Sequence, residues 1–560
     1  MKKITPILII MFAVFCMMCK TKTNESAKVL NSEHDVPAQD SLETICKQDF
    51  LELEKLQKDR TTPYDRYMLN GKLFSGCSKQ VFENNKQQYR YSFIQNGILQ
   101  RQIGYYVNGQ VDHDFNLVDG LPHGPERMWM SDGHLYIEHH YENGKQEGYQ
   151  RRWHSNHVLA REGYYRDGVA AFDLFFDPEG ELIEAESILP SVVNQSPQLF
   201  HIEEDGIFAD NRYPGANLHD FKKIGEAEYQ ATLVPENIPI NASPWYGFKL
   251  WSETPKTVKV KLVYTEHKHR FIPKLSKDGR NWTPMEASSI VIDEATRSAT
   301  LTFDLDSQPL WISAQENLDV AYFYDWLKSL SGTPGLEKKS FGKSKEGQEL
   351  VSLEVRAGKS VKAVVLIGRQ HPPEVPGATI ALEAFLETML TETPLATSFR
   401  QEYEIIAIPM ANPDGVDRGY WRHNANGFDL NRDWKRFLQP ETQAIRDYIQ
   451  GRVADGLEIV YGLDFHTSYS GPYLLVKDTA NQTSPPVITN RMIANIENNW
   501  ENYEVEQRPR SQDLPYCYNW FFNTFNAEAV TYEEGDEVER DLVQERAARY
   551  AIALMQALTE

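Results

Sequence analysis

Three kinds of hydrophobic patterning follow one another along the chain, and each predicts a different architecture. From about residue 66 to 185, short alternating runs are separated by Asn-Gly or Asp-Gly pairs. From about 195 to 315, alternation in runs such as 257–264 and 299–305 predicts short strands, which favours a β-sandwich. From 316 to 560, apolar strands alternate with helical stretches, which predicts an α/β domain. The chain is therefore expected to be multidomain, because one hydrophobic core rarely serves so long a sequence.

The segment 66–185 repeats itself. Its Asn-Gly and Asp-Gly pairs recur at a spacing of roughly 24 residues. They begin at Asn70, Asn96, Asp119, Asn143 and Asp167. Both central residues of a type I′ turn need φ > 0, so each pair predicts a hairpin and the set predicts a β-hairpin repeat array. The pattern resembles MORN-type repeats, and the interleaved aromatic residues are interpreted as its stacking core rather than as a ligand site.

The segment 316–560 is expected to hold a mainly parallel, mixed sheet flanked by helices. The expected strands are 361–367, 404–409, 459–465 and 527–532, and the expected helices are 378–390 and 541–558.

The N-terminus has the pattern of an export signal. Lys2-Lys3 precede an apolar run, Ile7–Met18, of about 12 residues, which fits a signal peptide and is too short to span a bilayer. Cys19 closes this run, and residues 1–19 resemble a bacterial lipoprotein signal whose cysteine is lipidated. Residues 20–65 are expected to form a polar tether with a short helix over 46–60. The protein is therefore expected to be exported to the periplasm or cell envelope and lipid-anchored there; a plain secretory signal cleaved nearby is the alternative.

Composition narrows the possible partners. The apolar and charged fractions, 41% and 25%, are ordinary for a folded protein. A net charge of −22 argues against binding to a nucleic-acid backbone, which requires clustered Lys and Arg. Outside the export signal only Cys46, Cys77 and Cys517 remain, an odd and sparse set with no paired spacing, so they define neither a zinc site nor a disulfide framework.

Two segments carry candidate metal ligands. His371-Pro372-Pro373-Glu374 follows the expected strand 361–367, and ligands of open α/β sheets bind beyond the carboxyl ends of strands. A His and a Glu three residues apart can share one zinc ion. His466 follows the expected strand 459–465 and could supply a third ligand. The alternative for His466 alone is a side chain that caps a loop by hydrogen bonding.

Between these segments lies a loop rich in Arg, Asn and Asp. It opens with Asn412-Pro413-Asp414-Gly415 and runs through Arg422 to Asp429-Leu430-Asn431-Arg432. Arginine forks grip carboxylates bidentately, so the loop could hold a substrate's terminal carboxylate. The alternative is an ordinary solvated turn.

Taken in order, these motifs resemble the zinc carboxypeptidase family of carboxypeptidases A and B, and most closely its cytosolic-carboxypeptidase-like branch. The resemblance covers roughly 200–560, including the β domain ahead of the catalytic one. It rests on His371-x-x-Glu374, Asn412–Gly415, Arg422, Asp429–Arg432, His466 and Thr531-Tyr532-Glu533.

The resemblance implies one Zn²⁺ ion bound by His371, Glu374 and His466. It also implies that Asp429 accepts a hydrogen bond from the far nitrogen of His371, which fixes the orientation of the ring.

The resemblance further implies the roles of the groups around the ion. Arg422 would polarise the scissile carbonyl, and Asn431 and Arg432 would hold the C-terminal carboxylate. Glu533 would be the general base, and it is preferred over Glu534 because alternate residues of a strand point to opposite faces. The family's substrate-contacting tyrosine has two candidates here, Tyr516 and Tyr518.

The expected function is that of a zinc metallocarboxypeptidase acting on the C-termini of peptides or proteins. One alternative is a zinc amidase or carboxypeptidase acting on cell-wall peptides. Another is a non-catalytic binding protein that works through its repeats, whose partner the sequence does not indicate. The presence of every implied zinc, clamp and base residue speaks against the latter.

Overall fold

The computed structural model describes residues 50–59, 66–81, 87–358, 360–478 and 486–559. The chain divides into two compact units on either side of the Ala170–Ala171 bond. The expected signal peptide, Cys19 and much of the expected tether lie outside the described residues. Within the described ranges, no helix is both long enough and apolar enough to cross a membrane.

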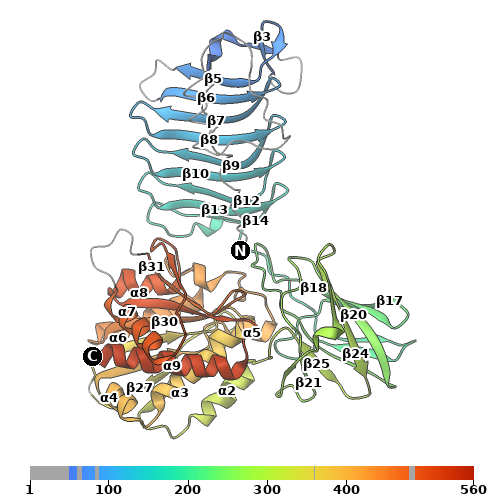
Figure 1. Ribbon diagram of the computed structural model, residues 1–560, viewed down its shortest axis with the longest axis vertical. Coiled ribbons are helices and arrows are strands. Elements are labelled where there is room, and N and C mark those ends of the chain that lie inside the picture. The colour runs from blue at the N-terminus through green and yellow to red at the C-terminus, as the bar shows by residue number, and fades with distance from the viewer. Residues whose placement is uncertain (1–49, 60–65, 82–86, 359, 479–485, 560) are drawn as a thin grey trace, which may run out of the picture. The chain divides into compact units, whose positions relative to one another are not determined.

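The first unit is built on one 11-stranded sheet, in which successive hairpins lie side by side (Figure 1). Strands pair antiparallel with their neighbours from β5 to β13. The principal strands are β5 (Gly76–Val81), β6 (Gln87–Gln95), β7 (Ile98–Tyr106), β8 (Val111–Val118), β9 (Leu121–Trp129), β10 (Leu135–Glu142), β12 (Gly148–Trp153), β13 (Leu159–Arg166) and β14 (Val169–Phe175).

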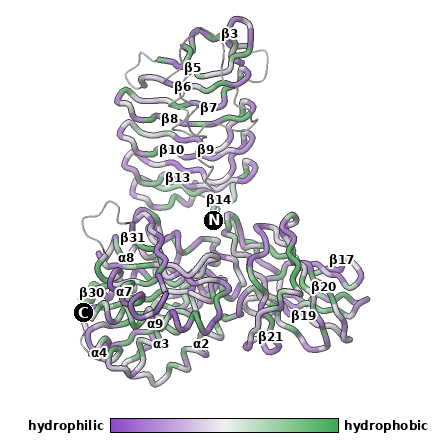
Figure 2. The backbone as a smooth tube through the Cα atoms, viewed as in Figure 1, coloured by the Kyte–Doolittle hydropathy of each residue, from purple (hydrophilic) through white to green (hydrophobic). Residues whose placement is uncertain are grey.

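The predicted Asn-Gly and Asp-Gly turns are confirmed. At each pair both residues have positive φ, for example 49° and 77° at Asn96-Gly97 and 49° and 82° at Asn143-Gly144. Mirror-image turns of this kind match the twist of the strands that they join. They therefore fix the register of each hairpin, and hydrophilic and hydrophobic stretches alternate along the resulting strands (Figure 2).

The short helix expected over 46–60 is not what the described part of that segment forms. Leu51–Glu52 is strand β1, Leu53–Lys55 is a single 3₁₀ turn and Gln57–Asp59 is strand β2. β1 pairs with β5, and β2 pairs with β3 (Arg66–Leu69). Pairing with existing strands has overridden a weak local helix preference. Cys77 of β5 is disulfide-bonded, which the cysteine spacing did not indicate.

The second unit begins with a β part of two sheets. A six-stranded sheet and a five-stranded sheet share one core, to which Phe248 and Ile312 contribute from the first sheet and Val260 and Leu301 from the second. The six-stranded sheet comprises β15 (Leu199–Ile202), β16 (Ile207–Asp210), β19 (Gly247–Ser252), β25 (Leu310–Ser313), β21 (Lys274–Ser276) and β22 (Thr283–Pro284). The five-stranded sheet comprises β17 (Asp220–Gly225), β18 (Glu228–Leu233), β20 (Lys256–Tyr264), β24 (Ser298–Leu305) and β23 (Ile290–Asp293). The strands predicted over 257–264 and 299–305 are β20 and β24.

The α/β part that follows contains an eight-stranded mixed sheet in the order β26-β27-β29-β28-β30-β33-β31-β32. The neighbouring pairs β29–β28, β28–β30 and β30–β33 are parallel, as the sequence predicts for the centre of the sheet. The strands are β26 (Leu336–Lys343), β27 (Glu349–Val355), β28 (Lys362–Ile367), β29 (Tyr403–Ile408), β30 (Glu458–Ser468), β31 (Tyr473–Lys477), β32 (Gln507–Arg510) and β33 (Glu528–Gly535).

Helices cover both faces of this sheet. They are α2 (Val320–Ser329), α3 (Leu382–Leu390), α4 (Pro394–Glu402), α5 (Pro413–Arg418), α6 (Pro440–Ala454), α7 (Val487–Asn499), α8 (Cys517–Phe525) and α9 (Arg540–Thr559). Val364 and Leu366 of β28 pack in one core with α3 and α9, whereas Val365 and Ile367 pack in another with α6 and α8. A strand buried on both faces needs a continuous apolar run, which is why β28 was recognisable in the sequence.

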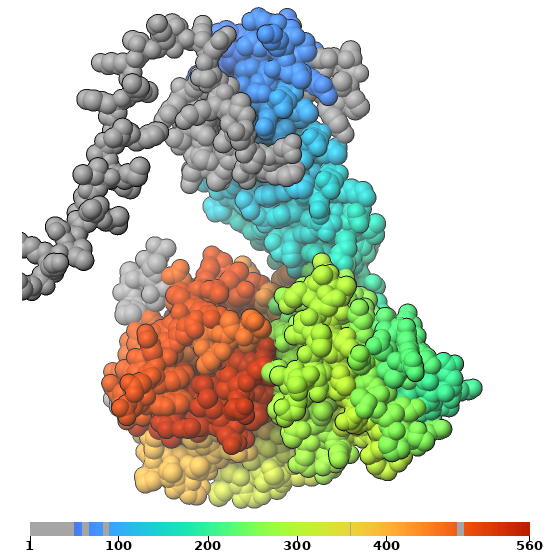
Figure 3. All heavy atoms as spheres, turned by 45° about the vertical axis from the view of Figure 1, so that its right-hand side comes forward, coloured from blue at the N-terminus to red at the C-terminus, as the bar shows by residue number. Residues whose placement is uncertain are grey.

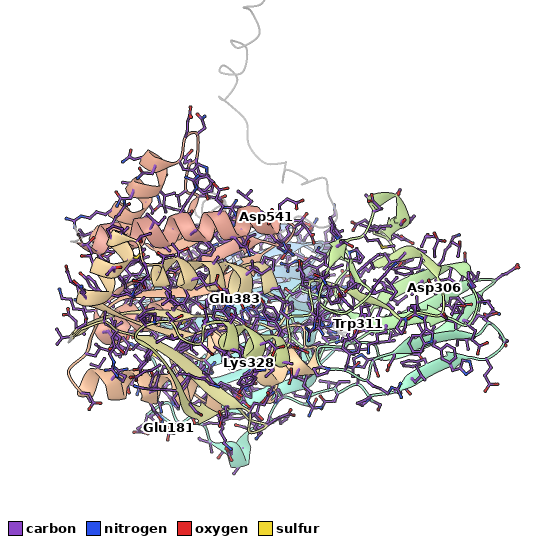
Figure 4. The ribbon with its side chains drawn as sticks, turned by 90° about the horizontal axis from the view of Figure 1, so that it is seen from below. Glu181, Asp306, Trp311, Lys328, Glu383 and Asp541 are labelled. Atoms are coloured by element: carbon purple, nitrogen blue, oxygen red, sulfur yellow. The ribbon has the colours of Figure 1, made fainter. Side chains whose placement is uncertain are left out.

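The β part and the α/β part of this unit are joined by ion pairs. Arg270 makes a bidentate pair with Asp536 at 2.7 and 2.9 Å, and Lys274 Nζ lies 2.7 Å from Glu537 Oε2. The two parts lie directly against each other in Figure 3. Figure 4 shows the unit from below, where Trp311 marks the β part and Glu383 of α3 marks the α/β part.

The buried pair of Glu534 and Arg546 generates a stability prediction. Arg546 of α9 donates to Glu534 of β33, and the two side chains are 6% and 0% exposed. Arg546→Met leaves an uncompensated buried carboxylate, so the free energy of unfolding should fall by about 3–5 kcal/mol. Urea unfolding followed by tryptophan fluorescence measures this change. The double variant Glu534→Gln/Arg546→Met should recover part of the loss; equal stability of Arg546→Met and the native protein would contradict the prediction.

Candidate metal and catalytic site

Three candidate ligands meet at the carboxyl edge of the central sheet. His371 and Glu374 lie between β28 and a π-helical turn, Pro376–Ala381. His466 lies inside β30, because this strand continues to Ser468 rather than ending at residue 465 as expected. Gly377 lets the turn approach the strand closely, since a Cβ there would lie 1.7 Å from the carbonyl oxygen of His466.

The ligand atoms of these three side chains converge. His371 Nδ1 lies 2.8 Å from Glu374 Oε1, and His466 Nδ1 lies 2.6 Å from Glu374 Oε2. One ligand atom from each of the three residues lies within 4.8 Å of the others, and all three residues are buried. Two imidazole nitrogens and a carboxylate are a donor set that zinc takes in catalytic sites, with a fourth position left for water or substrate. The residues therefore fit a single zinc ion.

Each histidine is held from behind by a carboxylate. His371 Nε2 lies 2.9 Å from Asp429 Oδ1, and His466 Nε2 lies 2.9 Å from Asp464 Oδ2. Such pairs fix the ring so that Nδ1 faces the metal position. Burial disfavours the charged imidazole, but Asp464 and Glu374 outweigh it and hold the pKa of His466 well above its ordinary value.

Asp464 was missed in the sequence. It precedes His466 by two residues in the same strand, so the two side chains share one face of the sheet. This spacing was the available signal. Gln370, which precedes His371, supports the same carboxylate by donating from Nε2 to Asp464 Oδ1 at 2.6 Å.

Glu533 of β33 lies beside the three ligands. It is the register partner of His466 on the neighbouring parallel strand, so their side chains share one face. Its Oε2 atom is buried and has no hydrogen-bond partner in the described parts of the chain. Burial, reinforced by the charges of Glu374 and Asp464, raises the pKa of Glu533 to about 8. Glu534 points to the opposite face, as the alternation predicts, and is occupied by Arg546.

Arg422 lies next to the ligands and is tied to them through Asp429. Its Nε donates to Asp429 Oδ2 at 2.6 Å, while the other oxygen of Asp429 faces His371. Burial alone would lower the pKa of Arg422, but Asp429 and Glu374 outweigh it and raise the pKa above the ordinary value. A fixed positive charge is thus held beside the ligand cluster.

The two residues expected to hold a terminal carboxylate differ in accessibility. The Asn431 amide is buried: its Nδ2 lies 3.0 Å from His466 Nε2, and its Oδ1 accepts from the Cys517 N–H at 2.8 Å. The side chain of Arg432 is 42% exposed, and its guanidinium lies 4.4 Å from the centre of the Tyr516 ring. Arg432 is therefore the member of the pair that an incoming ligand can reach directly.

The two candidate tyrosines lie in different surroundings. Tyr518 is fully buried in the core beneath the sheet, whereas Tyr516 is partly buried under the Arg432 guanidinium. Only Tyr516 is placed to meet a ligand that Arg432 binds.

A second residue missed in the sequence, Glu236, holds the loop that carries Arg422. Glu236 belongs to the β part and is 1% exposed. Its carboxylate accepts from the backbone N–H groups of Trp421, Arg422 and His423 at 2.8, 2.9 and 2.7 Å. Trp421 itself packs in the core of the β part. A lone glutamate in a loop far from the other motifs carries no pattern from which this role could be predicted.

The comparisons with known proteins agree with this geometry. Residues 323–504 match the family model described as zinc carboxypeptidase. The α/β part is a zinc carboxypeptidase domain. Cytosolic carboxypeptidase 2 of Xenopus tropicalis is 25% identical over 300 residues, which are 46% of this chain and 30% of that protein. Cytosolic carboxypeptidase 3 of Bos taurus is 23% identical over 399 residues, which are 64% of this chain and 36% of that protein. The chain thus spans about a third of these relatives.

Solved structures share the fold of a large part of this chain. A metallo-carboxypeptidase from Burkholderia cenocepacia superposes with a TM-score of 0.52 at 17% identity, covering 63% of this chain and 98% of that one. A metallo-carboxypeptidase from Pseudomonas aeruginosa superposes with a TM-score of 0.51 at 18% identity, with the same coverage. The likeness covers a larger share of the chain than residues 323–504.

The first prediction from this site separates metal binding from turnover. Glu533→Gln should keep one zinc ion per chain but lower kcat about 10²–10⁴-fold, because the amide cannot accept a proton. His466→Ala should lose the metal, because two ligands remain. Metal analysis alongside kinetics on a C-terminally labelled peptide measures both effects. Loss of zinc in Glu533→Gln, or retention of full activity, would count against the assignment.

The second prediction concerns Glu236. Glu236→Gln turns an amide NH₂ towards backbone donors and leaves at least one of them unpaired. Such a loss costs about 1–3 kcal/mol, so kcat should fall roughly 5- to 150-fold through displacement of Arg422. A double-mutant cycle with Arg422→Lys tests whether Glu236 acts through Arg422. If it does, Glu236→Gln should lower kcat little further once Arg422 is altered.

Glu537→Gln is the matched control for this cycle. It weakens another contact between the same two parts, with Lys274, without touching the Arg422 loop. It should lower stability but keep kcat. Purely additive effects of Glu236→Gln and Arg422→Lys would mean that Glu236 does not act through Arg422.

Proposed function

We propose that this protein is a zinc metallocarboxypeptidase that hydrolyses the C-terminal peptide bonds of peptides or proteins. The observation that carries the proposal is the buried convergence of His371, Glu374 and His466, with the unpartnered Oε2 of Glu533 on the adjacent strand. These residues would hold one Zn²⁺ ion. When bound, zinc supplies Lewis-acid polarisation of a carbonyl and lowers the pKa of water to about 7.

Glu533 is proposed as the general base. Its side chain shares one face of the sheet with His466, and from there it can accept the proton of the attacking water and pass it to the leaving amine. The surroundings that raise its pKa to about 8 suit both halves of this transfer, because a carboxylate of higher pKa accepts a proton more readily. The positive charge of a bound ion would favour the ionised form before the reaction.

Arg422 is proposed to stabilise the negative charge that develops on the carbonyl oxygen. The ion pair with Asp429 and the three backbone hydrogen bonds to Glu236 fix its position before substrate arrives. Arg432 is proposed to bind the terminal carboxylate directly, since its guanidinium is accessible. Asn431 is proposed to complete this clamp, which requires its amide to turn from its contact with His466.

The remaining parts of the chain are assigned by proposal as well. We propose that residues 1–19 direct export, that Cys19 is lipidated and that 20–65 tethers the protein in the periplasm or cell envelope. Residues 66–185 are proposed as MORN-like repeats, 195–315 as a β-sandwich and 316–560 as the catalytic domain. The hairpin turns support the assignment of the repeats, and the single core shared by two sheets supports the assignment of the β-sandwich.

Mass spectrometry of a peptide mixture tests the proposed reaction. The mixture is analysed before and after incubation with the full chain, with a chelator and with zinc restored after chelation. We expect single residues to leave from C-termini only, with loss of activity on chelation and recovery with zinc; Glu533→Gln serves as the inactive control. Internal cleavage would contradict the proposal. Cell-wall peptide fragments are incubated in parallel, and release confined to them would favour the amidase alternative.

A further inference from the structure

Three turns of the first unit have the same construction, at 106–110, 130–134 and 154–158. In each, the first N–H donates to the carbonyl of the fifth residue, at 2.8, 2.7 and 2.8 Å. The fourth residue of each turn has positive φ, 84° at Gly109, 92° at Gly133 and 67° at His157. Equivalent positions therefore carry glycine twice and histidine once.

His157 is the unusual member of this set. The left-handed region suits glycine, which has no Cβ, and disfavours a side chain as large as histidine. A residue held in a sparsely populated conformation persists where the surrounding structure gives a reason for it. The neighbours of the imidazole supply such a reason.

The His157 ring meets two side chains of the preceding turn. It stacks on the His134 ring with the ring centres 3.5 Å apart and the planes 14° apart. Asp132 reaches both rings: Oδ1 lies 3.3 Å from His134 Nδ1, and Oδ2 lies 3.4 Å from His157 Nε2. One ligand atom from each of the three residues lies within 4.8 Å of the others.

These separations are close to those between ligands of one ion. Atoms bound to a tetrahedral zinc ion at about 2.0–2.2 Å lie roughly 3.3–3.6 Å from one another. An N–H···O hydrogen bond is usually about 2.7–3.2 Å long. The Asp132 carboxylate is also fixed in place, because its Oδ1 accepts the His134 N–H at 3.0 Å.

We propose that the turns 130–134 and 154–158 bind one divalent transition-metal ion, such as Zn²⁺, through Asp132, His134 and His157. The ion ties two successive turns of the array together. Three protein ligands leave a coordination position that water or a group from another molecule can take. This site lies in the first unit and is independent of the proposed catalytic zinc.

The array supplies its own matched substitutions for a test. His157→Gly introduces the residue of the equivalent positions, Gly109 and Gly133. His134→Gln and Asp132→Asn introduce Gln110 and Asn108 from the first turn. Each new residue already occupies the same turn position elsewhere in the array, so the hairpins are expected to fold. His154→Met, taken from Met130, is the control for a nearby histidine outside the cluster.

The full-length native protein and each variant are dialysed to equilibrium against the same micromolar Zn²⁺ solution, and bound metal is counted by mass spectrometry. The native protein and His154→Met should bind one more ion per chain than His157→Gly, His134→Gln and Asp132→Asn. Peptide hydrolysis should be the same in all five proteins. Equal metal content in the native protein and in the cluster variants would overturn the proposal. Because the readout is a difference, it holds whether or not the second unit binds zinc.

Discussion

Parallel pairing of β28, β30 and β33 brings the carboxyl ends of three strands, far apart along the chain, to one edge of a sheet. The candidate ligands and the candidate base all project from that edge. His466 and Glu533 are cross-strand partners, so the same backbone hydrogen bonds that hold the sheet together set the spacing between ligand and base. A shift of register by one residue would turn either side chain to the opposite face. The pairing of the strands therefore also fixes the geometry of the site.

Around this edge, charge is arranged in layers. Asp429 and Asp464 stand behind the two histidines, while Arg422 and Gln370 support the aspartates. Each buried charge has a partner of opposite sign or a hydrogen bond, which burial requires. Glu533 Oε2 is the exception within this group: it has no hydrogen-bond partner in the described parts of the chain, and its residue is the register partner of His466. An unpaired oxygen costs stability in the resting protein and leaves the group available to a proton.

Much of this arrangement could be predicted from the sequence because it follows short-range rules. Continuous apolar runs identified β28, β29 and β30, and Asn-Gly pairs identified the hairpin turns. The ligand set followed from ordered motifs. The role of Glu236 and the detailed contacts of Asn431 could not be predicted. They depend on contacts between residues far apart in the sequence, which produce no periodic pattern along the chain. The short helix expected near residue 50 was wrong for a related reason: that segment joins strands whose positions are fixed by the array.

The three backbone N–H groups that converge on Glu236 have a consequence for how the catalytic part can be isolated. A fragment beginning near residue 316 would carry the zinc ligands, the base and the arginines, and would satisfy any motif-based definition of the domain. It would also leave three amides and the Trp421 indole ring without their present surroundings. The smallest self-sufficient form of the proposed enzyme therefore includes the β part, since the compact unit begins well before residue 316.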